Sequence, residues 1–255
     1  MKEAVIVSAA RTPIGKAYRG AYNQITGASL GAIPVAEAVC RAGIEPGEVE
    51  DCLMGCGLPQ GATGGNIARQ IALRAGLPVT VAGITMDRQC SSGLMAIATA
   101  AKQVIHDGQS IAVAGGIESI SLVQNDHMNT YCASDQALLR IAPAIYMPML
   151  DTAEVVAKRY QISREAQDEY ALQSQQRAAR AIAEGRFAGQ IVPVELKTRK
   201  GVQLFEVDEH VRGDVSLEQL AAMKTAFKQG GTVTAGNASG LNDGAAALLL
   251  AARRG

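Results

Sequence analysis

The chain has 255 residues, of which 48% are hydrophobic, and a mean hydropathy of +0.08, so it can bury the core of one large domain or two smaller ones. Lysine plus arginine balance aspartate plus glutamate at 24 each, which excludes a global field that recruits nucleic acid or an anionic membrane. The five cysteines and three histidines show no zinc-type spacing, so we expect no structural metal.

We expect no leader sequence in this chain. It opens almost directly into an apolar run, Ala4-Val5-Ile6-Val7, and no apolar stretch reaches transmembrane length. The odd cysteine count adds to this in favouring a reducing compartment. A cytoplasmic location is therefore the default expectation.

Short β-rich runs alternate with helical patterns in the first part of the chain. In chain order the patterns predict strands at 4–8, 49–56, 81–86 and 110–114, and helices at 28–42, 66–75 and 90–106. Strands separated by helices of this length favour parallel pairing with helices on the sheet faces. The predicted fold class is α/β.

The periodicity breaks after Gly116, and residues 119–149 are predicted to be an irregular excursion. A strong helix is predicted over 164–184, with Ser163 as its N-cap and Gly185 as its stop. Ser216 opens a shorter helix with the spacing of a capping box.

Residues 230–240 are too glycine-rich for a helix and are predicted to form a loop that exposes its backbone. Such a loop can cradle a phosphate or a pantetheine-like chain, or can be a plain turn. A buried strand is predicted at 245–251. The resulting division is a core domain of 1–118 plus 241–255 and an inserted domain of 119–240.

Cys90 is the candidate nucleophile. It lies between an apolar strand pattern and an alanine-rich helical pattern, and the partial positive charge and free amides of a helix entrance favour a thiolate. The alternative is a small buried hydrophobe. A cysteine nucleophile needs a base. We expect His106, His127 and His210 to be surface residues rather than this base.

Two other groups have mainly structural interpretations. Cys52 and Cys56 are even-spaced along a strand, which indicates a shared buried face rather than a metal pair. Glu118 at a strand end could be an acid, a base or a hydrogen-bond anchor, and we favour the anchor.

The sequence resembles the thiolase family (acetyl-CoA acyltransferases, 3-ketoacyl-CoA thiolases). The matching motifs run in order along the whole chain. They are Ser8-Ala9-Ala10-Arg11-Thr12-Pro13-Ile14-Gly15, Asp87-Arg88-Gln89-Cys90-Ser91-Ser92-Gly93-Leu94, Gly115-Gly116-Ile117-Glu118-Ser119-Ile120-Ser121, Thr152-Ala153-Glu154, and Gly231-Thr232-Val233-Thr234-Ala235-Gly236-Asn237-Ala238-Ser239-Gly240-Leu241-Asn242-Asp243-Gly244-Ala245-Ala246.

The resemblance implies a thiolase-like fold in which this chain is the N-terminal βαβαβαββ half with an inserted loop domain. The second half of the family supplies a Gly-His-Pro histidine, a Cys-x-Gly-Gly cysteine and an Asn-Glu loop, and none of these motifs occurs here. The C-terminal half is thus expected to be absent from this chain, through truncation, cleavage or a separate polypeptide, and the chain alone to be inactive.

The resemblance also implies the chemistry. Cys90 would attack the 3-keto carbonyl of a 3-ketoacyl-CoA, release acetyl-CoA and pass the shortened acyl group to a second coenzyme A; the reverse is a Claisen condensation. Coenzyme A is a substrate, and no tightly bound cofactor is implied. The loop domain would bind it through Arg212 near the nucleotide, Phe227 against the ligand, and Ala235 and Ser239 along the pantetheine arm.

The resemblance leaves the substrate class open. Leu150 stands where the family usually has glycine, and Pro148 aligns with the histidine of short-chain acetoacetyl-CoA thiolases. Cys90 and its neighbours look more like the degradative enzymes of fatty acid β-oxidation. The alternatives are an acetyl-CoA acetyltransferase, a non-catalytic half that binds coenzyme A or a partner, and a ketoacyl synthase that uses an acyl carrier protein. A homodimer or tetramer is expected.

Overall fold

The computed structural model describes residues 3–198, 201–225 and 228–253. These residues form two compact units. The sheet unit comprises Met1–Met128, Gly189–Glu209 and Leu241–Gly255, and the insert unit comprises Asn129–Ala188 and His210–Gly240. Among the described residues, no helix has both the length and the apolar character needed to cross a membrane.

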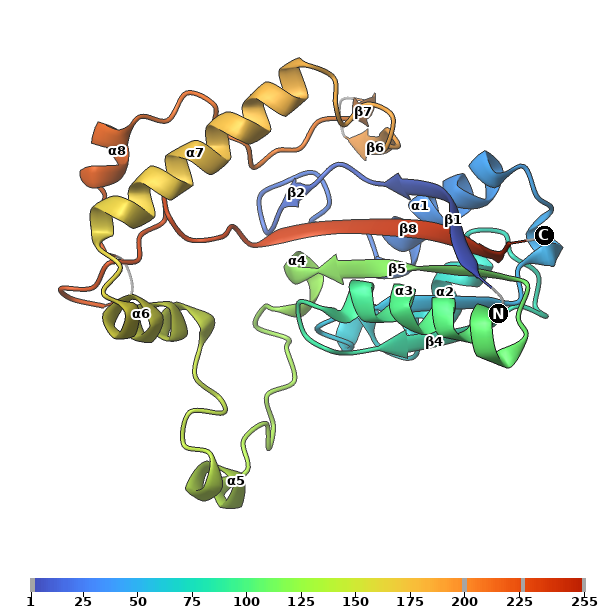
Figure 1. The fold of residues 1–255 in the computed structure, drawn as a ribbon, viewed down its shortest axis with the longest axis horizontal. Coiled ribbons are helices and arrows are strands. Elements are labelled where there is room, and N and C mark those ends of the chain that lie inside the picture. Colours follow the sequence, from blue (N-terminus) through green and yellow to red (C-terminus); the bar gives the residue numbers. More distant parts are fainter. Residues whose placement is uncertain (1–2, 199–200, 226–227, 254–255) are drawn as a thin grey trace. The chain divides into compact units, whose positions relative to one another are not determined.

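The sheet unit contains all the described strands (Figure 1). Its elements are β1 (Ala4–Arg11), β2 (Gly15–Lys16), α1 (Gly27–Ala42), η1 (Pro46–Glu48), β3 (Asp51–Gly55), η2 (Gly61–Thr63), α2 (Ile67–Arg74), β4 (Ala82–Met86), α3 (Ser92–Lys102), η3 (Gln103–Asp107), β5 (Ile111–Ser119), α4 (Ile120–Val123), β6 (Val194–Thr198), β7 (Gly201–Phe205) and β8 (Asn242–Ala252). The prediction of an α/β fold is confirmed.

The main sheet has the order β1-β8-β5-β3-β4, with β2 paired to β8. Strand β3 runs parallel to both β4 and β5, as predicted. Strand β8, whose direction was not predicted, runs antiparallel to its neighbours β1 and β5. Strands β1, β3, β4 and β5 therefore all run in the same direction, although β1 pairs with β8 rather than with a parallel strand. The composition of this segment shows that it is buried, but strand direction depends on how the chain returns to the sheet.

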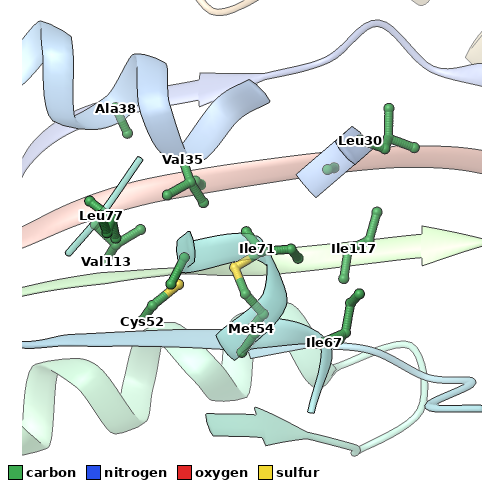
Figure 2. Close-up of a cluster of buried hydrophobic side chains, with 14 of the residues drawn as sticks. Leu30, Val35, Ala38, Cys52, Met54, Ile67, Ile71, Leu77, Val113 and Ile117 are labelled. Atoms are coloured by element: carbon green, nitrogen blue, oxygen red, sulfur yellow. The ribbon is translucent and has the colours of Figure 1, made fainter. Parts of the chain in front are cut away.

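Side chains alternate between the two faces of this sheet, as the period of two in a strand requires. On one face Met54 and Val113 pack with Leu30 of α1 and Ile71 of α2, a cluster shown in Figure 2. On the other face Leu53 packs with a set of alanines from α3 and the strands. Helices therefore cover both faces, and the small residues under α3 let that helix lie close to the sheet.

The insert unit consists of helices and loops (Figure 1). Its helices are α5 (Gln136–Ile141), α6 (Met149–Tyr160), α7 (Arg164–Ala183) and α8 (Leu217–Ala221). The predicted caps are confirmed, because the Ser163 hydroxyl accepts from the Ala166 amide at 3.2 Å and Ser216 forms a capping box with Gln219. Helix α6 was not predicted.

The unit boundaries differ from the predicted domains of 1–118 plus 241–255 and 119–240. Residues 189–209 return to the sheet unit, where the Arg11 amide donates to the Gln190 carbonyl and the Val192 amide to the Arg11 carbonyl, both at 2.8 Å. The β6–β7 hairpin then places Val194, 3% exposed, in the core of the sheet unit. Both contacts join segments far apart in sequence, so a local sequence pattern cannot predict them.

Candidate active site

Cys90 is exposed in the turn that joins β4 to α3. The Gln89 amide donates to the Asp87 carboxylate at 2.7 Å, and the Ser92 hydroxyl donates to the Gln89 carbonyl at 2.6 Å. Gln89 itself has a φ of 49°, in the left-handed region. The helix predicted to begin at Cys90 begins at Ser92 instead, which leaves the thiol on a braced turn just ahead of the helix.

Gly55, the last residue of β3, lets this turn lie directly on the sheet. A Cβ added at Gly55 would overlap the carbonyl carbon of Ser92 and the amide nitrogen of Gly93. Ser92 is correspondingly only 3% exposed. The first turn of α3, and with it Cys90, is therefore held against the end of β3 by backbone contact.

Two amides in the first turn of α3 make no hydrogen bond to a described residue. In the part of the chain that the structure describes, the amides of Gly93 and Leu94 have no acceptor, as is usual in the first turn of a helix. Such donors can stabilise an oxyanion that develops beside them. The site thus combines an accessible thiol with nearby unpaired amides.

Glu118 lies at the same end of the sheet and anchors the loop that follows β3. Its carboxylate accepts from the Gly57 amide at 2.8 Å and from the Cys56 thiol at 3.6 Å. Burial raises the pKa of Glu118, although these two hydrogen bonds oppose the shift. The contacts fit the anchor interpretation.

The five cysteines are all free and fall into two environments. Cys52 and Cys56 lie in the core cluster, as predicted. Burial raises the pKa of Cys52 to about 12 and that of Cys56 to about 11, with the Glu118 charge adding to the second shift. Cys40, Cys90 and Cys132 are exposed, and of these three only Cys90 lies in the turn that leads into α3.

No hydrogen bond joins Cys90 to either of the two histidines of the sheet unit, both of which the structure describes. His106 is exposed at the far end of the helix, about 20 Å along its axis from the thiol, and His127 is exposed beyond α4. His210 belongs to the insert unit. Among the described residues there is also no group of three or more His, Cys, Asp or Glu that could hold a metal ion.

Three of the four predicted coenzyme A contacts lie in the insert unit. Arg212 is exposed, and its backbone amide donates to the Gln175 side chain at 2.8 Å. Ala235 and Ser239 are exposed on the glycine-rich loop. Phe227 lies outside the described residues.

Two buried carboxylates that sequence reasoning left without a role support this loop. Glu154 of α6 is 8% exposed and accepts from the Thr232 and Val233 amides. Asp168 of α7 is 1% exposed and accepts from the Asn237 side chain. The signal available for Glu154 was its place in the Thr152-Ala153-Glu154 motif.

Comparison with known proteins assigns the chain to a family. Residues 4–254 match the family described as "Thiolase, N-terminal domain". The chain is 46% identical to "3-ketoacyl-CoA thiolase" of Bacillus subtilis (strain 168), an alignment that covers 98% of this chain and 66% of that protein.

Solved structures agree with this placement. The Bacillus anthracis acetyl-CoA acetyltransferase matches with a TM-score of 0.86 and 42% identity, covering 99% of this chain and 66% of that one. The human mitochondrial 3-ketoacyl-CoA thiolase in complex with CoA matches with a TM-score of 0.85 and 35% identity, covering 99% and 65%. The chain spans about two thirds of the length of these relatives. It belongs to the thiolase family, and the region that it matches is the N-terminal domain.

Proposed function

We propose that this chain takes part in thiolase-type acyl transfer with Cys90 as the acyl-accepting nucleophile. The observation that carries the proposal is the exposed thiol on a braced turn, next to the unpaired amides of α3. Relatives that align with nearly the whole of this chain are a 3-ketoacyl-CoA thiolase and an acetyl-CoA acetyltransferase.

The Cys90 thiolate attacks the 3-keto carbon of a 3-ketoacyl-CoA, and the carbon–sulfur bond forms as charge moves to the ketone oxygen. The bond between C2 and C3 then breaks, and the departing enolate of acetyl-CoA takes up a proton. The thiolate of a second coenzyme A attacks the acyl-thioester and regenerates Cys90.

Among the described residues of the sheet unit, no hydrogen bond to the Cys90 thiol identifies a base for it or an acid for the enolate. We therefore infer that this chain needs groups from a C-terminal thiolase half for turnover. Without them, binding of coenzyme A alone remains the second candidate function.

The insert unit is proposed to bind coenzyme A. Arg212 offers a guanidinium that can pair with a phosphate, while the small residues Ala235 and Ser239 let an extended arm approach the loop. Phe227 completes the proposed set. The human relative has been solved with CoA bound, which supports this class of ligand.

The substrate is proposed to be a 3-ketoacyl-CoA of broad chain length, with a short-chain acetoacetyl-CoA as the alternative. The relatives include both types. Comparing turnover of acetoacetyl-CoA with that of a longer 3-ketoacyl-CoA separates the two, and gives a first indication of a degradative or a biosynthetic role.

A cytoplasmic location and a homo-oligomeric state are also proposals. The free state of all five cysteines fits a reducing compartment. The edge strands β1 and β4 carry exposed apolar side chains, Ile6 at 59% and Ile84 at 42%. An unpaired strand edge can pair with another chain, and exposed apolar side chains beside it favour such a contact.

The test is acyl-enzyme trapping. The natural protein is incubated with acetyl-CoA, digested and analysed by mass spectrometry, and we expect the acetyl group on the peptide containing Cys90. Iodoacetamide should label Cys90 first, acyl-CoA should protect it, and Cys90→Ala should abolish turnover. Equal labelling of all five cysteines, or full turnover by Cys90→Ala, would contradict the proposal.

A further inference from the structure

The first residues of the glycine-rich loop are hydrogen-bonded to a buried carboxylate, that of Glu154. Glu154 accepts from the Thr232 and Val233 amides, each at 2.8 Å, through Oε1, and from the Thr232 hydroxyl at 3.1 Å through Oε2. Gly231 is also held to this site, because a Cβ there would come within 2.5 Å of Oε1 of Glu154. One side chain of α6 thus fixes three consecutive loop residues.

A second carboxylate holds the middle of the same loop. Asp168 of α7 accepts from the Asn237 side-chain amide at 2.9 Å and from Arg164 at 2.7 Å. Asn237 in turn accepts from the Thr234 amide at 2.8 Å and donates to the Thr232 carbonyl at 3.0 Å. The loop is therefore tied to two helices.

With these hydrogen bonds, one side of the loop is buried and the other side is exposed. Val233 and Thr234 are buried at 4% and 0% exposure, whereas Ala235 and Ser239 are exposed. A loop this rich in glycine would otherwise sample many conformations. A ligand that binds the outside then needs to order little of the loop, which favours binding.

We propose that Glu154 is a positioning residue for coenzyme A: by bonding Thr232 and Val233 it presents Ala235 and Ser239 to the pantetheine arm. The inference rests on the proposed function. Glu154 acts through the loop, since it is only 8% exposed and its carboxylate accepts all three hydrogen bonds from loop residues. The nucleotide end of coenzyme A, assigned to Arg212, should depend on Glu154 much less.

This difference makes a role in positioning measurable. Calorimetric titration of the natural protein with CoA, and with adenosine 3',5'-bisphosphate, which lacks the arm, compares the two ends of the ligand. For Glu154→Ala we expect the Kd for CoA to rise about tenfold or more and the Kd for the bisphosphate to stay within about twofold. In thiolysis assays KM for CoA should rise more than kcat falls.

Two variants serve as controls. Glu154→Gln keeps an oxygen for both amides and can donate to the Thr232 hydroxyl, so it should retain most of the CoA affinity. Asp151→Ala, an exposed acidic residue of the same helix, should bind like the wild type. If Glu154→Ala does not fold, Asn237→Ala must show the same selective loss.

The outcomes are distinct. Unchanged CoA affinity in Glu154→Ala, or equal loss of both ligands in folded Glu154→Ala and Asn237→Ala, would overturn the inference but leave the proposed function standing. Wild-type protein that binds neither ligand would overturn both.

Discussion

Replacing Gly55 by alanine should disturb the position of Cys90 without touching the thiol. The added Cβ would overlap the backbone of Ser92 and Gly93, and ordinary contact requires the first turn of α3 to move by roughly 1 Å. Overpacking of this size costs about 1–3 kcal/mol of stability. A displacement of about 1 Å at a reacting group can lower turnover by about a hundredfold.

The assay combines two measurements on the same protein. Urea unfolding should give a free energy of unfolding lower by about 1–3 kcal/mol for Gly55→Ala. Alkylation by iodoacetamide should change at Cys90 relative to the exposed Cys40 and Cys132, which serve as internal references. The matched control is Gly47→Ala, since a Cβ at Gly47 has nothing within 4 Å.

A Gly55→Ala protein with wild-type stability and wild-type labelling of Cys90 would refute this reasoning. It would show that α3 is free to slide on the sheet. Loss of stability with unchanged labelling of Cys90 would show instead that the contact is only structural.

Three further predictions concern charge and packing. Burial would raise the pKa of Asp208, but Arg11 and a backbone amide hold it below its usual value; its contribution is full above about pH 4 and is lost as the pH falls through the lowered pKa. Asp208→Asn should therefore lose about 1–3 kcal/mol at neutral pH and nothing in acid, and an equal loss at both pH values in urea unfolding would contradict this. Leu53→Ala, at a fully buried site under α3, should lose about 2–5 kcal/mol in the same assay, and a loss below 1 kcal/mol would argue against the packing. Cys56, with its pKa raised to about 11, should resist iodoacetamide in the native protein and react after denaturation; native labelling as fast as that of exposed cysteines would contradict its burial.

Local patterns predicted the elements that depend on local physics. The Ser163 cap, the Ser216 capping box and the shared buried face of Cys52 and Cys56 each follow from spacing within a few residues. The direction of β8 and the return of residues 189–209 to the sheet unit do not, because both depend on which distant segment the chain meets. Helix α6 was missed because its pattern follows directly on an irregular, proline-containing stretch.

The candidate site shows the same division between local and distant causes. Cys90 was predicted from its place between a strand pattern and a helix pattern. The sequence does not show which backbone atoms a side chain at Gly55 would overlap. The structure supplies the partner, the backbone of Ser92 and Gly93.

Gly115 follows the same rule, since a Cβ there would overlap the carbonyl oxygen of Ala246, a residue 131 positions away. Gly55 and Gly115, which carry no reactive group, thus permit backbone contact between neighbouring elements. Substitutions at such glycines should change reactivity at Cys90 through the position of α3 and β5, whereas substitutions at Glu154 should change only how the insert unit receives its ligand.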